Sequence, residues 1–469
     1  MKTTRRKMET GRTHKKYLIA VFIVILLWLG YALFTFNAGK NRPNVVFITL
    51  DALRADHLNC YGYERNTSPH IQALAKKGVL FKQAISQASH TSASVGSIVS
   101  SLYPNHEIRE AGYFLSPQDD NLVRVLKNEG YATAIFSNAQ PTLEIVLSGI
   151  KDAFDVFDFA PVQADKVVSS ADRWLGRNCR KPFFLWVYLN DTHWPYNVPD
   201  SYFSGFLSDN LHPRLDVPIA AEDGSRNEHY SFRVLPRHVV KNKITDTSYY
   251  IALYDGSIKF TDEQVGLLLK RLADRGLLGN TLVVLFSDHG ESLTEHNFFF
   301  NHSHFLYEGL IRVPLIMALP GRIPARVIER QVQSINIVPT VREILKIKED
   351  SCLEGRSMLP LMNNKIEQLD LYAFSETAYK PSPVCVRTED WKLIRNRDTK
   401  YGHRKLELYN LKDDPRELHN LADTRLEVVA SLVDRLNEWE KAAKTYSIGI
   451  KQDISPEEKE KLRSLGYIG

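Results

Sequence analysis

Three short stretches of this chain are continuously apolar and rich in strand-forming residues, at residues 45–50, 183–189 and 282–286. A strand needs such a run only when both of its faces are buried, as in a parallel sheet that helices cover on each side. Helical patterns separate the three stretches, for example over residues 69–77 and 121–129. The alternation predicts an α/β fold with a doubly wound, mostly parallel sheet.

Two further patterns refine this expectation. Thr261 and Gln264 have the spacing of a capping box, which predicts that another helix begins at Thr261. From residue 371 onward the chain has short alternating strands and then an amphipathic helix near residues 426–439. We therefore expect a main domain over residues 42–370 and a smaller C-terminal α+β subdomain with a tail over residues 371–469.

Residues 17–36 contain no charged side chain. At 1.5 Å per residue a helix of this length spans about 30 Å, the thickness of the hydrocarbon core of a membrane. The basic residues before it predict a cytoplasmic tail over residues 1–16, a transmembrane signal anchor over residues 17–36, and a remainder outside the cytoplasm, periplasmic or extracellular. A cleaved signal peptide is the weaker alternative, because Phe36-Asn37-Ala38 is not a cleavage site of small residues.

The net charge of +5 arises from the first sixteen residues, where seven basic residues and one acidic residue give +6. The remainder of the chain is therefore close to −1. A nucleic-acid-binding domain needs basic residues clustered on its folded surface. The charge pattern predicts no nucleic-acid partner.

The strands at residues 45–50 and 282–286 run directly into polar residues, the first into Asp51 and the second into Ser287-Asp288-His289-Gly290. In a parallel sheet the carboxyl ends of the strands meet at one edge, where ligands bind. Two carboxylates and one imidazole suit a divalent metal such as Zn²⁺, Mn²⁺ or Ca²⁺. The alternative is that each aspartate only forms a turn or caps a helix.

The motifs around these residues resemble those of the sulfatase family, within the alkaline phosphatase-like superfamily. The matching segments are residues 43–56 (PNVVFITLDALRAD), 60–63 (CYGY), 67–71 (TSPHI), 254–258 (YDGSI), 287–291 (SDHGE), 306–308 (LYE) and 312–316 (RVPLI). They occur in the order of the family and extend over residues 42–423. The resemblance implies a catalytic domain that cleaves anionic esters with the help of a divalent metal.

The resemblance places the nucleophile at Thr91, so that the implied metal ligands are Asp51, Thr91, Asp288 and His289. In true sulfatases this position is a cysteine or serine that becomes formylglycine, followed by a proline and an arginine. Here Ala93 and Val95 stand at those two positions, which argues against formylglycine. Membrane-anchored phosphoglycerol and phosphoethanolamine transferases are similar in using an unmodified threonine. Ser92 and Ser94 are alternative nucleophiles.

Several histidines and two cations complete the expected site. His193 lies in a segment that resembles the His-x-Pro-Tyr element of the family, and His302 and His304 lie where relatives carry a Gly-His-x-His element. We expect these three histidines to be catalytic, although a histidine in a loop is more often only solvated. Arg312 or Lys392 would bind the anion, unless either forms an ordinary ion pair.

These observations predict a metal-dependent hydrolase or transferase that cleaves phosphate or sulfate esters through Thr91. An outward-facing site near a membrane suits a glycan or a lipid head group as the anionic ester substrate. One alternative is a strict sulfatase that acts on sulfated glycans. Another is a sulfatase-like protein that binds an anionic polymer without cleaving it.

Overall fold

The computed structural model describes residues 42–104, 121–139, 141–207, 211–212, 214–220, 232–348, 353–377, 383–397 and 404–446. In this part of the chain an eight-stranded sheet has the order β4-β3-β5-β1-β6-β7-β2-β8. The strands are β1 (Asn44–Leu50), β2 (Val79–Ile85), β3 (Ala132–Ser137), β4 (Val156–Phe159), β5 (Phe183–Leu189), β6 (Thr281–Phe286), β7 (Arg312–Ala318) and β8 (Arg326–Gln333). Neighbouring strands are parallel except where β7 pairs with β6 and β2. The predicted large, mostly parallel sheet is confirmed.

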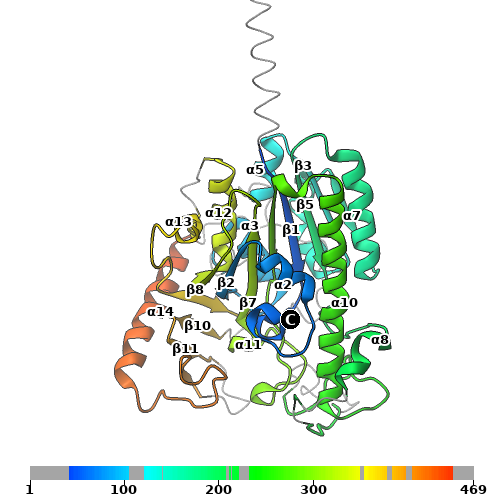
Figure 1. Ribbon diagram of the computed structural model, residues 1–469. Helices are drawn as coiled ribbons and strands as arrows, with labels where there is room; N and C mark the ends of the chain where they lie inside the picture. Colours follow the sequence, from blue (N-terminus) through cyan, green and yellow to red (C-terminus); the bar gives the residue numbers. More distant parts are fainter. Residues whose placement is uncertain are drawn as a thin grey trace, which may run out of the picture.

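Helices cover both faces of this sheet, as Figure 1 shows. The helices on one face are α2 (Pro69–Ala75), α7 (Ala164–Asn178) and α10 (Thr247–Asp274). Those on the other face are α3 (Thr91–Ser100), α5 (Leu122–Asn128), α6 (Thr142–Ser148), α12 (Ile337–Ile344) and the short α13 (Leu359–Met362). The three apolar stretches of the sequence are β1, β5 and β6, and every residue of these strands is buried. Burial on two faces explains their continuous apolar pattern.

The helix predicted to begin at Thr261 begins fourteen residues earlier, so that prediction was wrong. α10 starts at Thr247, and the side chain of its N-cap residue Asp246 accepts a hydrogen bond from the backbone N–H of Ser248. Thr261 lies inside the helix, where its hydroxyl donates to the carbonyl oxygen of Ser257 at 2.8 Å. A hydroxyl that bonds back within the helix offers no cap. Burial of one face through the whole length of the helix decided the boundary instead.

A second, antiparallel sheet follows in the chain, with the order β12-β11-β10-β9. Its strands are β9 (Ala373–Glu376), β10 (Val384–Arg387), β11 (Trp391–Arg395) and β12 (Leu406–Asn410). The helix α14 (Leu426–Tyr446) packs on one face of this sheet, where Trp439 stacks on Phe374 with ring centroids 5.0 Å apart. Figure 1 shows this unit beside the β8 edge of the large sheet.

A group of buried charges joins the second sheet to the main domain. Glu308 begins the short helix α11 (Glu308–Ile311), which directly precedes β7. The guanidinium of Arg387 donates to both carboxylate oxygens of Glu308 at 3.0 Å. The Lys392 ammonium lies 3.1 Å from Glu308 and 2.5 Å from Glu417. Arg387 and Lys392 lower the pKa of Glu308 despite its burial, whereas burial raises the pKa of Glu417 to about 7.

Replacing Lys392 with methionine is expected to lower the free energy of unfolding by ~3–5 kcal/mol, because the change leaves Glu308 and Glu417 buried without their shared cation. Urea denaturation measures this loss. Lys270→Met is the matched control, since Lys270 forms an exposed pair with Asp274 and its loss should leave the free energy of unfolding nearly unchanged. Equal effects of the two substitutions would contradict a stabilising role for the buried cation.

Among the described residues, no helix is both long and apolar enough to cross a membrane. The predicted anchor at residues 17–36 and the basic tail before it lie outside the described residues. The anchor therefore stays a prediction from the sequence.

Candidate active site

The carboxyl ends of β1 and β6 bring the predicted metal ligands together. β1 and β6 are adjacent and parallel, with Thr49 opposite Phe286, so the residues that follow them emerge at the same edge. Asp51, Asp288 and His289 each offer a ligand atom there, and these atoms lie within 4.8 Å of one another. His289 Nε2 is 3.5 Å from Asp51 Oδ1 and 3.5 Å from Asp288 Oδ2. We refer to these three residues as the metal cluster.

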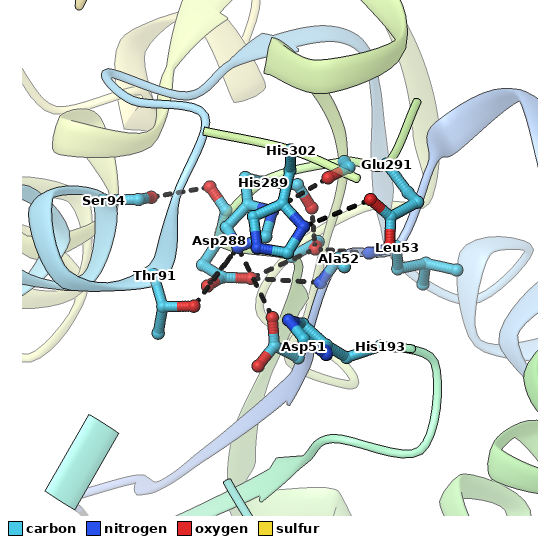
Figure 2. A network of polar contacts seen from close by, with 12 residues as sticks. Asp51, Ala52, Leu53, Thr91, Ser94, His193, Asp288, His289, Glu291 and His302 are labelled. Carbon is cyan, nitrogen blue, oxygen red and sulfur yellow. Dashed lines mark hydrogen bonds and ion pairs between the residues drawn. The ribbon is translucent and has the colours of Figure 1, made fainter. Parts of the chain in front are cut away.

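Thr91 faces the metal cluster from the start of α3 (Figure 2). Its Oγ1 lies 3.2 Å from His289 Nε2. His90 has extended backbone angles and ends the preceding loop, so Thr91 is the first residue of the helix. The N-terminal end of a helix carries a partial positive charge, which favours negative charge on the hydroxyl oxygen.

The protonation of His289 also suits metal binding. Its Nδ1 lies 2.8 Å from the carbonyl oxygen of Gly290, which can only accept a hydrogen bond. In the neutral tautomer that this contact selects, Nδ1 carries the proton and Nε2 presents its lone pair to the cluster. This arrangement is the one that a metal-ligating histidine requires.

The charge balance of the cluster fits a bound cation. Burial and the neighbouring Asp288 raise the pKa of Asp51. Asp51 Oδ1 is buried and accepts no hydrogen bond in the described part of the chain. Lysine and arginine form no ion pair with Asp51 or Asp288 within the same part. Two buried carboxylates without a lysine or arginine partner need protons, a protonated His289 or a divalent cation, and Asp51, Asp288, His289 and Thr91 would hold that cation.

Two predicted histidines lie beside the cluster, as Figure 2 shows. The ring of His302 is 4.4 Å from that of His289, and the ring of His193 is 4.8 Å from that of His302. Burial lowers the pKa of His193 to about 4, and burial also lowers the pKa of His302. His193 Nδ1 is 2.8 Å from the carbonyl oxygen of Trp194, so the neutral ring presents an unprotonated Nε2. His193 is therefore neutral near pH 7, with Nε2 free of a proton.

The remaining predicted residues have different surroundings. The Nδ1 atom of His304 lies 3.0 Å from the carbonyl oxygen of His302, and its ring lies against Phe298. Arg312 is partly exposed and lies 3.7 Å from Glu308. Lys392 is fully buried between Glu308 and Glu417, so the expectation that it binds the substrate anion was wrong. A cation that is completely buried between two carboxylates cannot reach a ligand.

Residues 232–238 lie in the polar stretch that follows α8 (Asp200–Phe203). They contact the loop after β6 and the loop after β5. The N–H of Arg233 donates to the carbonyl oxygen of Asn297 at 2.7 Å, in the loop that follows β6. The exposed ring of His238 lies 3.9 Å from the ring of Trp194, which follows His193. The described part of this stretch thus contacts the loop that follows β6 and the loop that carries His193.

Three residues at the site were not predicted. The Tyr188 hydroxyl donates to Asp288 Oδ2 at 2.8 Å, and the Thr192 hydroxyl donates to the carbonyl oxygen of Asp51. Glu291 is fully buried and lies 3.1 Å from His302 Nδ1. Tyr188 is the one hydroxyl-bearing residue of an otherwise apolar strand, next to the strand that leads to Asp51. That position in the sequence was the signal that could have identified Tyr188 as a residue of the site.

Comparison with known proteins agrees with the geometry. The sulfatase family model matches residues 43–347, and the model described as N-sulphoglucosamine sulphohydrolase, C-terminal, matches residues 294–442. The uncharacterized sulfatase YidJ of Escherichia coli is 21% identical, covering 86% of this chain and 89% of its own length. An arylsulfatase of Clostridium perfringens is 24% identical, with 82% and 91% covered.

A solved structure shares the fold. The crystal structure of the phosphonate monoester hydrolase of Agrobacterium radiobacter superposes with a TM-score of 0.70 at 21% identity, covering 86% of this chain and 96% of the hydrolase. The family model alone spans well over half of the chain, including β1, the helix α3 and the residues Asp51, Asp288 and His289. This chain belongs to the sulfatase family.

Proposed function

We propose that the protein cleaves phosphodiesters or sulfate esters by nucleophilic attack of the Thr91 hydroxyl, with transfer to water or to an acceptor alcohol. The observation that carries the proposal is the Thr91 Oγ1 atom, 3.2 Å from His289 Nε2 at the edge of a buried cluster of two carboxylates. A divalent cation bound there would favour the alkoxide and polarise a nonbridging oxygen of the ester.

The proposed reaction consists of two successive displacements. In the first, the Thr91 hydroxyl gives its proton to a neutral histidine beside the cluster, a bond forms from Thr91 Oγ1 to phosphorus or sulfur, and the bond to the leaving oxygen breaks so that this oxygen departs with the electron pair. In the second, water or an alcohol attacks the same atom and the bond to Thr91 breaks. His193 and His302 are neutral acceptors beside the cluster, and either can take the proton of the second attacking hydroxyl.

The local charge favours a substrate with a single negative charge. Sulfatases carry an arginine four residues after the nucleophile. In this chain that position, counted from Thr91, is the fully buried Val95. The Lys392 ammonium forms ion pairs with Glu308 and Glu417, and Arg312 lies beside Glu308. A phosphate monoester would bring two negative charges to this site, whereas a phosphodiester or a sulfate monoester brings one. With an unmodified threonine at the nucleophile position, we favour the phosphodiester.

Turnover of three aryl esters with the same leaving group tests this preference. We expect the highest kcat/KM for an aryl phosphodiester, a lower value for the aryl sulfate, and the lowest for the aryl phosphate monoester. Mass spectrometry of the peptide that contains residue 91 should show unmodified threonine. Preferred turnover of the sulfate would instead support a strict sulfatase, the activity named for the Clostridium perfringens relative. Binding of sulfated polymers without any turnover would support the non-enzymatic alternative.

We also propose that residues 17–36 anchor the protein in a membrane with the catalytic domain outside the cytoplasm. The charge-free stretch and the preceding cluster of basic residues support this orientation. In fractionated cells the full chain should sediment with membranes and resist carbonate extraction. Protease added outside the cytoplasmic membrane should digest the catalytic domain. Recovery of the full-length chain in the cytoplasmic fraction would contradict the proposal.

A further inference from the structure

Two buried serine hydroxyls contact the backbone of the metal loop, by which we mean residues 287–290. Ser86 Oγ lies 2.5 Å and Ser94 Oγ 2.6 Å from the carbonyl oxygen of Asp288. The two hydroxyls are 2.9 Å apart, and both serines are fully buried. Among the described residues, no backbone N–H donates to this carbonyl oxygen, because β6 has already ended. The hydroxyls therefore satisfy a buried acceptor that the sheet leaves open.

The same serines belong to the two segments that position the nucleophile. Ser94 lies in the first turn of α3, and its N–H donates to the carbonyl oxygen of His90, the residue before Thr91. Ser86 follows β2 and precedes the loop that leads to Thr91. Figure 2 shows the Ser94 side chain directed from α3 toward Asp288, on the same side of the loop as Thr91. The hydroxyls thus connect the nucleophile helix directly to the metal loop.

The C-terminal sheet holds the first of these segments. The Ser375 hydroxyl in β9 donates to the carbonyl oxygen of Ser86 at 2.6 Å. The N–H of Glu376 donates to the carbonyl oxygen of Gln87 at 3.0 Å, and Glu376 forms a parallel bridge with Ala88. The edge of the second sheet therefore continues onto the residues before Thr91.

We infer that Ser86 and Ser94 are positioning residues that fix the Thr91 hydroxyl relative to Asp288 and His289. The inference rests on the proposed role of Thr91. Neither hydroxyl is directed at a substrate, since both lie against the carbonyl oxygen of Asp288, and the Ser86 hydroxyl shares its single proton with the carbonyl oxygen of Ala88 at 2.8 Å. Their loss lets the first turn of α3 move relative to the metal loop. A displacement of about 1 Å at a reacting group costs on the order of 100-fold in rate.

Ser94→Ala tests this inference, with Ser100→Ala as the matched control. Ser100 is a buried serine of the same helix, but its hydroxyl donates within the helix, to Gly96 at 2.8 Å. We expect Ser94→Ala to lower kcat for an aryl phosphodiester by about 10- to 100-fold, with KM changed less than about twofold. The affinity for Mn²⁺ alone, measured by titration calorimetry, should fall by roughly tenfold. Ser100→Ala should change neither quantity.

Equal kcat and equal Mn²⁺ affinity in the two variants would overturn the inference. The Mn²⁺ titration decides the question even if no ester is turned over, because it reports on the metal loop directly. Should Ser94→Ala fail to fold, Ser86→Ala is judged by the same two measurements. Full activity of a Thr91→Ala protein would instead remove the proposed nucleophile, and a selective loss of Mn²⁺ affinity in Ser94→Ala would then still support the contact with the metal loop.

Discussion

Replacing Asp288 with asparagine is expected to abolish binding of the divalent cation and to lower kcat/KM by ~10³-fold or more. Asparagine keeps the size of the side chain but removes a negative charge from the cluster of Asp51, Asp288 and His289. A cation that stabilises the transition state contributes several kcal/mol, and each ~1.4 kcal/mol corresponds to a tenfold change in rate. Steady-state kinetics and calorimetric titration with Zn²⁺, Mn²⁺ and Ca²⁺ measure the two effects.

The stability of the metal-free protein distinguishes this effect from unfolding. The charge of Asp288 helps to raise the pKa of Asp51, so the two carboxylates repel each other when no cation is bound. Asp288→Asn removes this repulsion, and its melting temperature in the presence of a chelator should equal or exceed that of the wild type. Added metal should stabilise only the wild type. A large drop in the chelated variant would show that Asp288 supports the fold rather than the cation.

The sequence predicted the centre of the fold well because burial there leaves a local pattern. β1, β5 and β6 are apolar along their whole length, since helices cover both faces of the sheet. The start of α10 was missed because the capping signal at Thr261 is local, whereas the helix continues through it along a buried surface. The antiparallel direction of β7 depends on its pairing with β6 and β2, which no short pattern records.

The residues of the site also fall into two groups, those that a local sequence pattern predicts and those that depend on contacts in the folded chain. Asp51, Asp288 and His289 could be predicted because each follows the end of a buried strand, and Thr91 because its surroundings resemble the family. Lys392 was misassigned, since nothing near it in the sequence indicates that Glu308 and Glu417 enclose it. Tyr188, Glu291 and the Ser94 contact depend on pairs of residues that are 100, 11 and 194 positions apart. Such contacts appear only once the chain is folded.

Thr91→Ala is expected to reduce kcat by ~10³-fold or more, because it removes the hydroxyl that we propose attacks the ester. Thr91→Ser keeps a hydroxyl at the first position of α3 and should retain activity within about tenfold. Comparing these two variants distinguishes the contribution of the hydroxyl from that of the rest of the Thr91 side chain. Rapid mixing and acid quenching should trap a covalent adduct on the peptide with Thr91 in the wild type and on the same peptide in Thr91→Ser, but none in Thr91→Ala.

The two neighbouring serines provide the decisive comparison for the nucleophile. Ser94 has its hydroxyl bound to the carbonyl oxygen of Asp288 at 2.6 Å, which directs it at the backbone rather than at an ester. Ser92 shares the first turn of the helix with Thr91, and Ser92→Ala should keep kcat within about twofold of the wild type. An adduct found on Ser92, or full activity of Thr91→Ala, would move the nucleophile away from Thr91. Because Thr91 Oγ1 lies 3.2 Å from His289 Nε2, we expect the adduct on residue 91 and its disappearance when Asp288 is replaced.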